Sequence, residues 1–315
     1  FLPLTKWTTR FYHDTVNETI LKAAGITVSG VPGPVHIGVP AGIGTIPVAK
    51  ATDQIKYLRL EKEPLGKDFY ESANQARDFF EQAKKPLIAA GLTAARAGVK
   101  QYLLEMAEKH QLPVVLTPMA KGLFPENHPL YAGVLFHALS EQVAQTYAEA
   151  DLVVGIGYDP VEFNYEAWMP DVPLIHFDNR PADVDFSQVK KVINLTGDLK
   201  ITLAEFGGFG SEIKDWNTEK IRIRKEEMFR KLMSSAEIFG PSAVISALRK
   251  ALPQDGILTV DVGAHLHLVG QQWQTPSTEK LLMTNGWSSM GFGVPAAIAA
   301  KLCHPDLPVA CLTGD

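Results

Sequence analysis

The stretch TNGWSSMGFGVPAAIAAKLCHPDLPVACLTGD, residues 284–315, decides the fold of this chain. It begins as a loop punctuated by glycines, and a helix of small residues follows from about Pro295 to Leu302. Proline suits the first turn of a helix, where its missing N–H costs nothing, and alanines let a helix pack closely on a sheet. The apolar run from Pro308 to Thr313 then predicts a buried strand, which ends in Gly314 and Asp315.

Asp315 carries a carboxylate directly after this strand. Open α/β sheets bind ligands outside the carboxyl ends of their strands. If the ligand is an anion, the carboxylate needs a cation between them, and oxygen ligands suit Mg²⁺ and Ca²⁺. The sequence therefore predicts that Asp315 holds a divalent metal ion beneath a diphosphate.

Two segments, SSMGFGVPAAIAAKL (288–302) and LTGD (312–315), resemble the thiamine-diphosphate enzymes of the acetolactate synthase and pyruvate decarboxylase superfamily. LTGD is similar to the start of that family's GDG…N motif for metal and diphosphate, so its glycine and aspartate are candidate contacts. The resemblance also implies that Met290 lies between the two cofactor rings and keeps the cofactor bent, with its amine beside the reactive carbon. The backbone carbonyls of Ser288 and Met290 would accept hydrogen bonds from that amine. The alternative is an alanine- and glycine-rich core helix in which the methionine is a filler.

The composition is that of a soluble globular protein, and 315 residues are enough for two domains. A net charge of -5 argues against a nucleic-acid-binding surface, and glutamates interrupt the basic run 220–231, which predicts a solvated helix face. Cys303 and Cys311 are too few for a disulfide framework and predict free thiols in a reducing cytoplasm. No run approaches the roughly 18 apolar residues of a membrane span, and no signal peptide is visible.

Residues 1–40 predict an amphipathic helix that starts near Leu4 and a strand from Val35 to Pro40. One helix and one strand cannot bury a core of their own, so we expect the tail of a larger domain. The segment resembles the end of the superfamily's pyrimidine-binding domain. Lys6 stands where related synthases carry a lysine near the active-site entrance, although a lysine at a helix start is more often just solvated. Phe1 is not a natural start and the last motif stops midway, so we expect a fragment of a longer protein.

Residues 41–67, with prolines, glycines and mixed charge, predict a linker. Alternating helices and short apolar strands in residues 68–206 then predict an α/β domain with a parallel sheet covered by helices on both faces. This section resembles the superfamily's central domain, including the runs PVVLTPMAKGLFPENHPLYAG and ADLVVGIGYDPVEFNYEAW. The expected strands are Pro86–Gly91, Pro113–Thr117, Leu152–Gly157, Pro173–Asp178 and Lys191–Leu195, and the expected helices are Asp68–Ala83, Gly98–Lys109 and Ser140–Glu149.

The run 157–162 is most similar to the acetolactate synthases that lack FAD. FAD-binding synthases usually have an arginine where Tyr158 stands, so the resemblance implies that FAD is absent. A nicotinamide-binding domain is the competing interpretation, but the Gly155-Ile156-Gly157 run lacks a third small residue at the required offset, and no apolar strand precedes the run at Gly291. Asp178, at the end of a predicted strand, either caps a loop or contacts a ribose.

Three glycines and a charged stretch in residues 207–239 predict a second linker, and residues 240–315 predict the truncated N-terminal part of a diphosphate-binding domain. Its strand from Ile257 to Val262 leads into the run DVGAH. Glycine there permits close approach of the backbone to a phosphate, and free N–H groups after a strand can bind an anion.

The superfamily has a similar run in contact with the diphosphate, so Gly263, Ala264 and His265 are candidate cofactor contacts. Ala264 replaces a glutamine that is frequent in the family, which removes one side-chain hydrogen bond. His265 and His267 lack a third ligand at a suitable spacing, which argues against a metal site at this pair.

The resemblance as a whole implies an acetolactate synthase-like enzyme with thiamine diphosphate and Mg²⁺, in branched-chain amino acid or acetoin metabolism. It would decarboxylate pyruvate and join the product to a second 2-keto acid, with the hard chemistry supplied by the cofactor. A simple 2-keto acid decarboxylase and a non-catalytic scaffold or regulatory relative remain open. The family's active site forms between subunits, which implies a homodimer or homotetramer. Its catalytic glutamate is expected outside these residues, so we expect the 315-residue chain alone to be inactive.

Overall fold

The computed structural model describes residues 1–29, 32–47, 65–158, 171–183, 189, 191–234, 239–285 and 288–314. The chain divides into two compact units, residues 1–64 and residues 65–315. No helix among the described residues is both long and apolar enough to cross a membrane.

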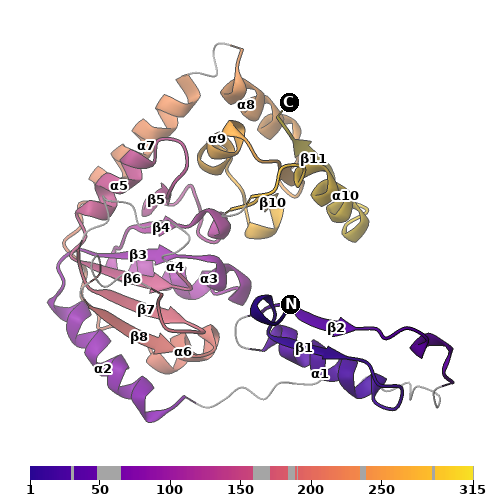
Figure 1. The fold of residues 1–315 in the computed structure, drawn as a ribbon. Helices are drawn as coiled ribbons and strands as arrows, with labels where there is room; N and C mark the ends of the chain where they lie inside the picture. Colours follow the sequence, from indigo (N-terminus) through magenta and orange to yellow (C-terminus); the bar gives the residue numbers. More distant parts are fainter. Residues whose placement is uncertain are drawn as a thin grey trace. The chain divides into compact units, whose positions relative to one another are not determined.

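The first unit is a small parallel β–α–β arrangement (Figure 1). Strand β1 (Trp7–Arg10) pairs with β2 (Val35–Gly38), and α1 (Val16–Val28) connects them. Our expectation of a helix from Leu4 onward was wrong for the first residues, because an aromatic and two threonines favour a strand when a partner is present. The ammonium of Lys6 donates to the carbonyl and the hydroxyl of Ser29, the residue that caps the C-terminus of α1.

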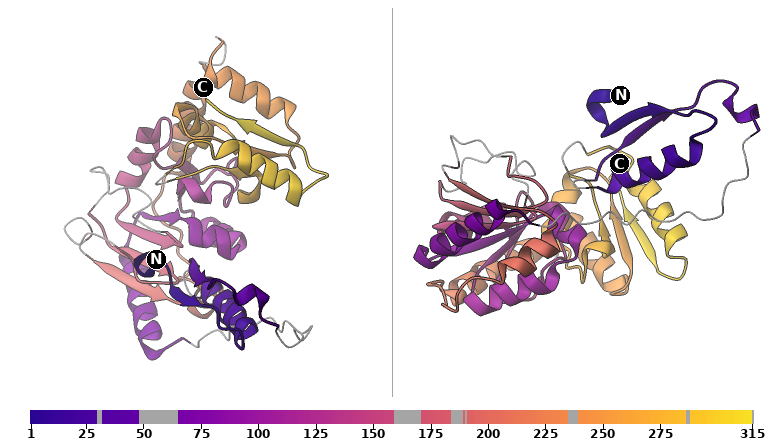
Figure 2. Two further views of the ribbon diagram at one scale, coloured as in Figure 1. Left: turned by 45° about the vertical axis from the view of Figure 1, so that its right-hand side comes forward. Right: turned by 90° about the horizontal axis from the view of Figure 1, so that it is seen from below.

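The second unit is built around a six-stranded parallel sheet in the order β5-β4-β3-β6-β7-β8 (Figures 1 and 2). Helix α2 packs against β8, α6 against β7 and β8, and α5 against β5. The strands are β3 (Pro86–Ala90), β4 (Val114–Leu116), β5 (Tyr131–Val134), β6 (Leu152–Ile156), β7 (Leu174–Asp178) and β8 (Val192–Thr196), and the helices are α2 (Lys67–Gln82), α3 (Leu92–Ala97), α4 (Lys100–His110), α5 (Ser140–Ala148) and α6 (Leu199–Phe206).

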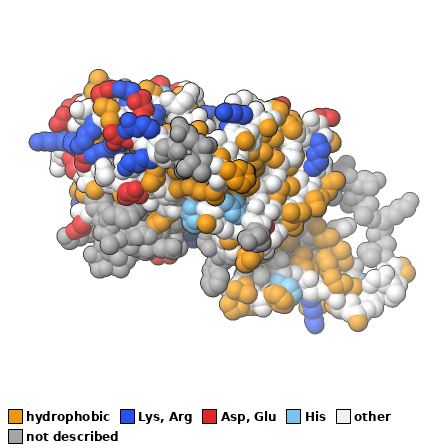
Figure 3. Space-filling view, turned by 90° about the horizontal axis from the view of Figure 1, so that it is seen from above, with side chains coloured by type: hydrophobic (Ala, Val, Ile, Leu, Met, Phe, Trp, Pro, Cys, Tyr) orange, Lys and Arg blue, Asp and Glu red, His pale blue; other side chains and the backbone are white. Residues whose placement is uncertain are grey.

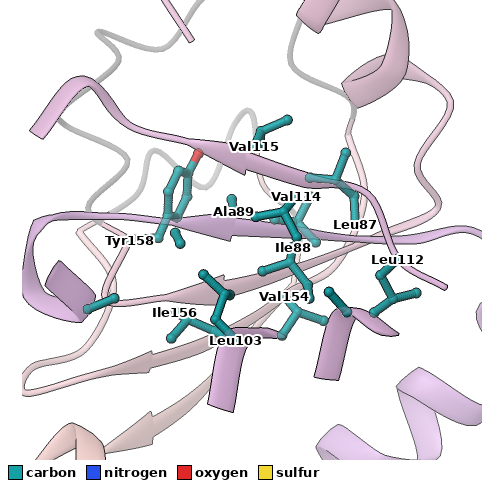
Figure 4. Packing of buried hydrophobic residues seen from close by; sticks show 14 of the residues in the cluster. Leu87, Ile88, Ala89, Leu103, Leu112, Val114, Val115, Val154, Ile156 and Tyr158 are labelled. Atoms are coloured by element: carbon teal, nitrogen blue, oxygen red, sulfur yellow. The ribbon is translucent and has the colours of Figure 1, made fainter. Parts of the chain in front are cut away.

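Every side chain of β3 to β7 is buried. Successive side chains of a strand point to opposite faces, so both faces of this sheet are covered, as predicted. Figure 4 shows part of this packing, with Ile88 and Val154 on the side of Leu103 of α4 and Leu87 on the other side of β3. The continuous apolar runs that we used to predict the strands are a consequence of this double burial.

The segment that we assigned to the second linker contains a packed helix, α7 (Thr218–Ser234). Ile221, Met228 and Leu232 are buried in the core of the six-stranded sheet. The opposite side of α7 is solvated as expected, and positive and negative side chains intermingle on the left of Figure 3. The sequence predicted only the solvated face of this helix, because its buried apolar residues are widely spaced among lysines, arginines and glutamates.

The second unit also contains a three-stranded parallel sheet in the order β10-β9-β11. Its small hydrophobic core includes Trp273 and Val269. Figure 2 shows α10 alongside β11, as expected for a helix that precedes a parallel strand. The strands are β9 (Ile257–Val260), β10 (Leu281–Leu282) and β11 (Val309–Leu312), and the helices are α8 (Pro241–Ala251), α9 (Ala264–Gln272) and α10 (Gly293–Cys303). Short 3₁₀ turns lie at Leu2–Leu4, Ile43–Thr45, Pro118–Ala120 and Thr278–Lys280. Both cysteines are free thiols, and Cys303 is exposed.

A candidate cofactor-binding site

Three loops meet at the carboxyl edge of the three-stranded sheet. One loop follows β9 and spans residues 261–263, the second leads from β10 to α10, and the third begins after β11 at Thr313. Because the three strands are parallel, their carboxyl ends lie at the same edge, which is where α/β sheets bind ligands.

Gly263, His265 and Gly314 come together at this edge. Gly263 caps α9 with a φ of 156°, and a Cβ there would lie 2.8 Å from two atoms of the His265 ring. A Cβ on Gly314 would lie 3.4 Å from Cε1 of the same ring. The imidazole therefore fits between two glycines from different strand ends, and Ala264 is exposed at the first position of α9.

The Nε2 atom of His265 is buried and has no hydrogen-bond partner among the described residues. Buried polar atoms in folded proteins are nearly always paired, so an unpaired one calls for an explanation such as a ligand. The first backbone N–H groups of α9 point out of the same end of the helix, and the helix dipole adds partial positive charge there. This end of α9 can thus hold an anion.

Asp261, which we did not predict, ties the second loop to the first. One carboxylate oxygen accepts hydrogen bonds from the backbone N–H of Val262 at 2.7 Å and of Gly291 at 3.0 Å, and the other accepts from Gly291 at 3.1 Å. These bonds, together with the N–H groups of the first turn of α10, lower the pKa of the Asp261 carboxyl below its ordinary value. The position of Asp261 directly after a strand could have marked it as a site residue. Its partner Gly291 lies 30 residues away, so the sequence does not show the contact.

Met290 lies in the turn next to Gly291, at the start of α10, and its side chain is 83% exposed. Ser288, two residues earlier, is partly exposed. Asp315 lies outside the described residues, so its metal role stays a prediction. No group of three or more histidine, cysteine, aspartate or glutamate side chains in the described part of the chain is placed to hold a metal ion.

A cavity of about 630 Å³ lies beside the second loop. On one side it is lined by Leu92 and Arg96 of α3, in the domain of the six-stranded sheet. On the other side it is lined by Met283, Asn285 and Phe292, in the segment between β10 and α10. The loop that carries Met290 is therefore next to a space large enough for a small organic molecule.

The six-stranded sheet reverses its strand order between β3 and β6, which is the usual place for a nucleotide in such a sheet. A Cβ on Gly91 would overlap the backbone of Gly157, so the two turns lie in direct contact. Tyr158 is 1% exposed, and its hydroxyl lies 3.3 Å from that of Tyr147. Residues 159–162 of the predicted run are outside the described residues.

Asp178 is the last residue of β7. Its carboxylate is buried and accepts a hydrogen bond from the backbone N–H of Asn179 at 2.5 Å. Burial raises the pKa of this carboxyl, although His176 nearby opposes the shift. These contacts favour the first of the two roles that we considered, closing the loop after β7.

Residues 73–206 match the family "Thiamine pyrophosphate enzyme, central domain", and residues 261–315 match "Thiamine pyrophosphate enzyme, C-terminal TPP binding domain". The chain belongs to the thiamine pyrophosphate enzymes. Its second unit accordingly contains two of this family's domains, and the three loops described above lie in the cofactor-binding one.

Relatives of this thiamine pyrophosphate enzyme include acetolactate synthases. The acetolactate synthase large subunit of Parasynechococcus marenigrum is 29% identical over 100% of this chain and 52% of the relative. Isozyme 1 large subunit from Escherichia coli is 28% identical over 100% of this chain and 56% of the relative. The acetolactate synthase of Arthrospira platensis is 29% identical over 94% of this chain and 53% of the relative. The chain spans about half the length of the curated relatives that it matches.

The residues at the edge of the three-stranded sheet fit the diphosphate of this family's cofactor. The unpaired Nε2 of His265 can donate to a phosphate oxygen, and the N–H groups at the start of α9 can do the same. Gly263 leaves the backbone open on the side where a Cβ would otherwise crowd the imidazole.

Proposed function

We propose that the protein carrying this chain uses thiamine diphosphate and Mg²⁺ to decarboxylate pyruvate and to join the two-carbon product to a second 2-keto acid, as acetolactate synthases do. The family membership supports the cofactor, and the acetolactate synthases among its relatives support the reaction. The observation that carries the proposal is the unpaired Nε2 of His265 between Gly263 and Gly314.

In this proposal the chain binds and orients the cofactor. The N–H groups at the start of α9 and the imidazole of His265 hold the diphosphate, and Asp315 holds the Mg²⁺ that neutralises it. When bound, thiamine diphosphate supplies the carbon nucleophile for the 2-keto carbon and accepts the electron pair released with CO₂. Met290 supports the bent shape that brings the reacting groups together, which replaces a bimolecular encounter by a fixed geometry.

Asp261 serves the same site through the backbone. Its carboxylate fixes the N–H of Gly291 and therefore the turn that carries Met290. A mobile turn would let the side chain of Met290 leave the cofactor, because that side chain has little packing of its own. Asp261 thus keeps the second loop in place before the cofactor arrives.

Product analysis tests the reaction. The purified protein is incubated with pyruvate, thiamine diphosphate and Mg²⁺, and acetolactate, acetaldehyde and CO₂ are quantified. We expect acetolactate with one CO₂ released for each molecule formed. Acetaldehyde as the main product would favour a simple decarboxylase, and the absence of both products would contradict an enzymatic role.

We further expect a cytoplasmic homodimer or homotetramer that does not require FAD. Tyr158 is buried at the strand-order reversal of the six-stranded sheet, at the position where flavin-binding relatives usually carry an arginine. A yellow protein that releases stoichiometric FAD on denaturation would contradict the cofactor expectation. A monomer in light scattering would contradict the assembly.

A further inference from the structure

Gln271 of α9 forms hydrogen bonds with the backbone at the end of β5. Its Oε1 accepts from the N–H of Val134 at 3.0 Å, and its Nε2 donates to the carbonyls of Val134 at 3.0 Å and Ala138 at 3.2 Å. The side chain is completely buried. Its amide thereby occupies the place of a neighbouring strand at the carboxyl end of β5 and joins two domains that are far apart in sequence.

Two glycines make room for this contact. Gly133 has a φ of 120°, and a Cβ there would lie 2.6 Å from Cγ2 of Val143 and 3.3 Å from Oε1 of Gln271. On α9, a Cβ on Gly270 would overlap the buried ring of His137. The backbone N–H of Ala138 also donates to the carbonyl of His267, at 3.0 Å. The end of β5 and the turn after it therefore pack closely against α9.

The turn after β5 adopts an unfavourable backbone conformation. Phe136 and Leu139 have φ values of 64° and 58°, a region that side-chain-bearing residues seldom adopt. Such conformations persist where the surroundings hold them, and they concentrate at functional sites. Here the carbonyl of Ala138, between the two residues, accepts the hydrogen bond from Gln271.

The helix that carries Gln271 begins at the candidate diphosphate site. Gln271 lies six positions after His265, which corresponds to about 9 Å along a helix axis. A short helix is stiff over this distance. The position of α9 relative to β5 therefore determines where the first N–H groups of α9 lie. A shift of about 1 Å at a binding or reacting centre is enough to lower its performance severely.

We propose that Gln271 is a positioning residue, which fixes α9 on the central domain and thereby places Gly263 and His265 for the diphosphate. This inference rests on the proposed function, because it takes the start of α9 as the diphosphate site. Gln271 itself does not touch the cofactor in this account.

The neighbouring Gln272 provides a matched control. It lies on the same helix and is also buried, but its Nε2 donates to the carbonyl of Ser242 at 2.9 Å and the hydroxyl of Ser246 at 2.8 Å, both on α8. The Nε2 also lies 3.7 Å from the sulfur of Met233 on α7, a weak contact, and among the described residues the side chain makes no hydrogen bond to β5 or the turn after it. Gln271→Met and Gln272→Met each keep the side-chain volume and remove the amide. Both changes should lower the thermal stability, but only Gln271→Met breaks the hydrogen bonds that hold α9 to the end of β5 and the turn after it.

The test compares the dissociation constant of thiamine diphosphate, measured by calorimetry with Mg²⁺ present, in the two variants. We expect Gln271→Met to raise it about tenfold, because a displaced α9 no longer presents its first N–H groups to the diphosphate, and Gln272→Met to change it less than about threefold. Equal dissociation constants in the two variants would overturn the proposal, whatever their stabilities.

A second pair of variants decides the matter if Gln271→Met does not fold. Gly270→Ala pushes a methyl group into the ring of His137 and should weaken cofactor binding, and the added change His137→Ala should restore it to within about threefold of wild type. Failure of the double variant to restore binding would also overturn the proposal.

Amide hydrogen exchange separates this inference from the proposed function. In cofactor-free protein, Gln271→Met should speed exchange of the α9 amides more than Gln272→Met does, because it releases the helix from the central sheet. If wild-type protein binds no thiamine diphosphate, the proposed function fails, and this exchange difference alone shows whether Gln271 fixes α9. Identical exchange in both variants would refute that role.

Discussion

The ammonium group of Lys121 donates hydrogen bonds of 2.9 Å to both carboxylate oxygens of Glu126, and both side chains are 2% exposed. Burial lowers the pKa of Lys121 and raises that of Glu126, because each charged form loses its hydration, while the partner opposes each shift. The pair lies in the segment after β4, beside the cavity that borders the candidate site. The two hydrogen bonds hold that segment in place.

We expect Lys121→Met to destabilise the protein by about 3–5 kcal/mol, because it leaves the Glu126 carboxylate buried without its partner. Urea unfolding measures this loss. The double change Lys121→Met with Glu126→Met should recover most of it, since it removes both charges and keeps apolar volume. A double variant as unstable as the single one would show that the ion pair is not the cause.

Glu149 predicts a dependence of stability on pH. Burial raises the pKa of its carboxyl, but hydrogen bonds from Lys220, Arg224 and Lys85 outweigh this and lower the pKa to about 2. A carboxyl whose pKa is lower in the folded state stabilises the protein above its unfolded pKa, and the contribution is lost as pH falls toward the folded value.

Glu149→Gln should therefore destabilise the protein at pH 7, and its difference from wild type should shrink between about pH 4.5 and pH 2. Denaturant unfolding at several pH values measures this. Glu71→Gln is the control, because Glu71 is an exposed residue 3.7 Å from Lys67 and such pairs contribute little. A difference that stays constant down to pH 2 would argue against the ion-pair explanation.

Met290→Ala should reduce turnover of pyruvate more than it reduces the affinity for thiamine diphosphate. The side chain is exposed, so its removal costs little stability. We expect this side chain to keep the cofactor bent and not to bind the diphosphate. Leu302→Ala, on an equally exposed side chain at the far end of α10, is the control. Unchanged turnover in Met290→Ala would mean that another residue holds the cofactor rings.

Asp315→Ala should weaken the Mg²⁺-dependent binding of thiamine diphosphate severely, because it removes a charged oxygen ligand of a hard cation. The measurement is a titration of the cofactor at several Mg²⁺ concentrations. Asp306→Ala, an exposed aspartate in the loop before β11, serves as control. If cofactor binding in Asp315→Ala depends on Mg²⁺ as it does in wild type, Asp315 is not a ligand of the metal ion.

The sequence predicted those elements whose partners lie nearby or whose burial is complete. The apolar runs of β3, β6 and β7 identify them as buried strands without any further information. Trp7–Arg10 gives no such signal, because it becomes a strand only by pairing with Val35–Gly38. The short run Tyr131–Val134 escaped notice for a similar reason, since Gly133 interrupts it.

The candidate site shows the same division. Gly263 and His265 follow a predicted strand, so their chemistry could be inferred from local order. The role of Asp261 depends on Gly291, and that of Gln271 depends on Val134, 137 residues away. Contacts of this kind depend on how whole domains pack together, so they cannot be predicted from a short sequence pattern.

Calorimetric titration of thiamine diphosphate with Mg²⁺ tests the central claim most directly, because that claim places the diphosphate at His265. Wild-type protein should bind the cofactor stoichiometrically, and His265→Ala should bind it about tenfold more weakly, since it removes the unpaired donor. His267→Ala, an exposed histidine on the same helix, should bind like wild type. No binding by wild-type protein, or equal affinity in His265→Ala and His267→Ala, would contradict the account.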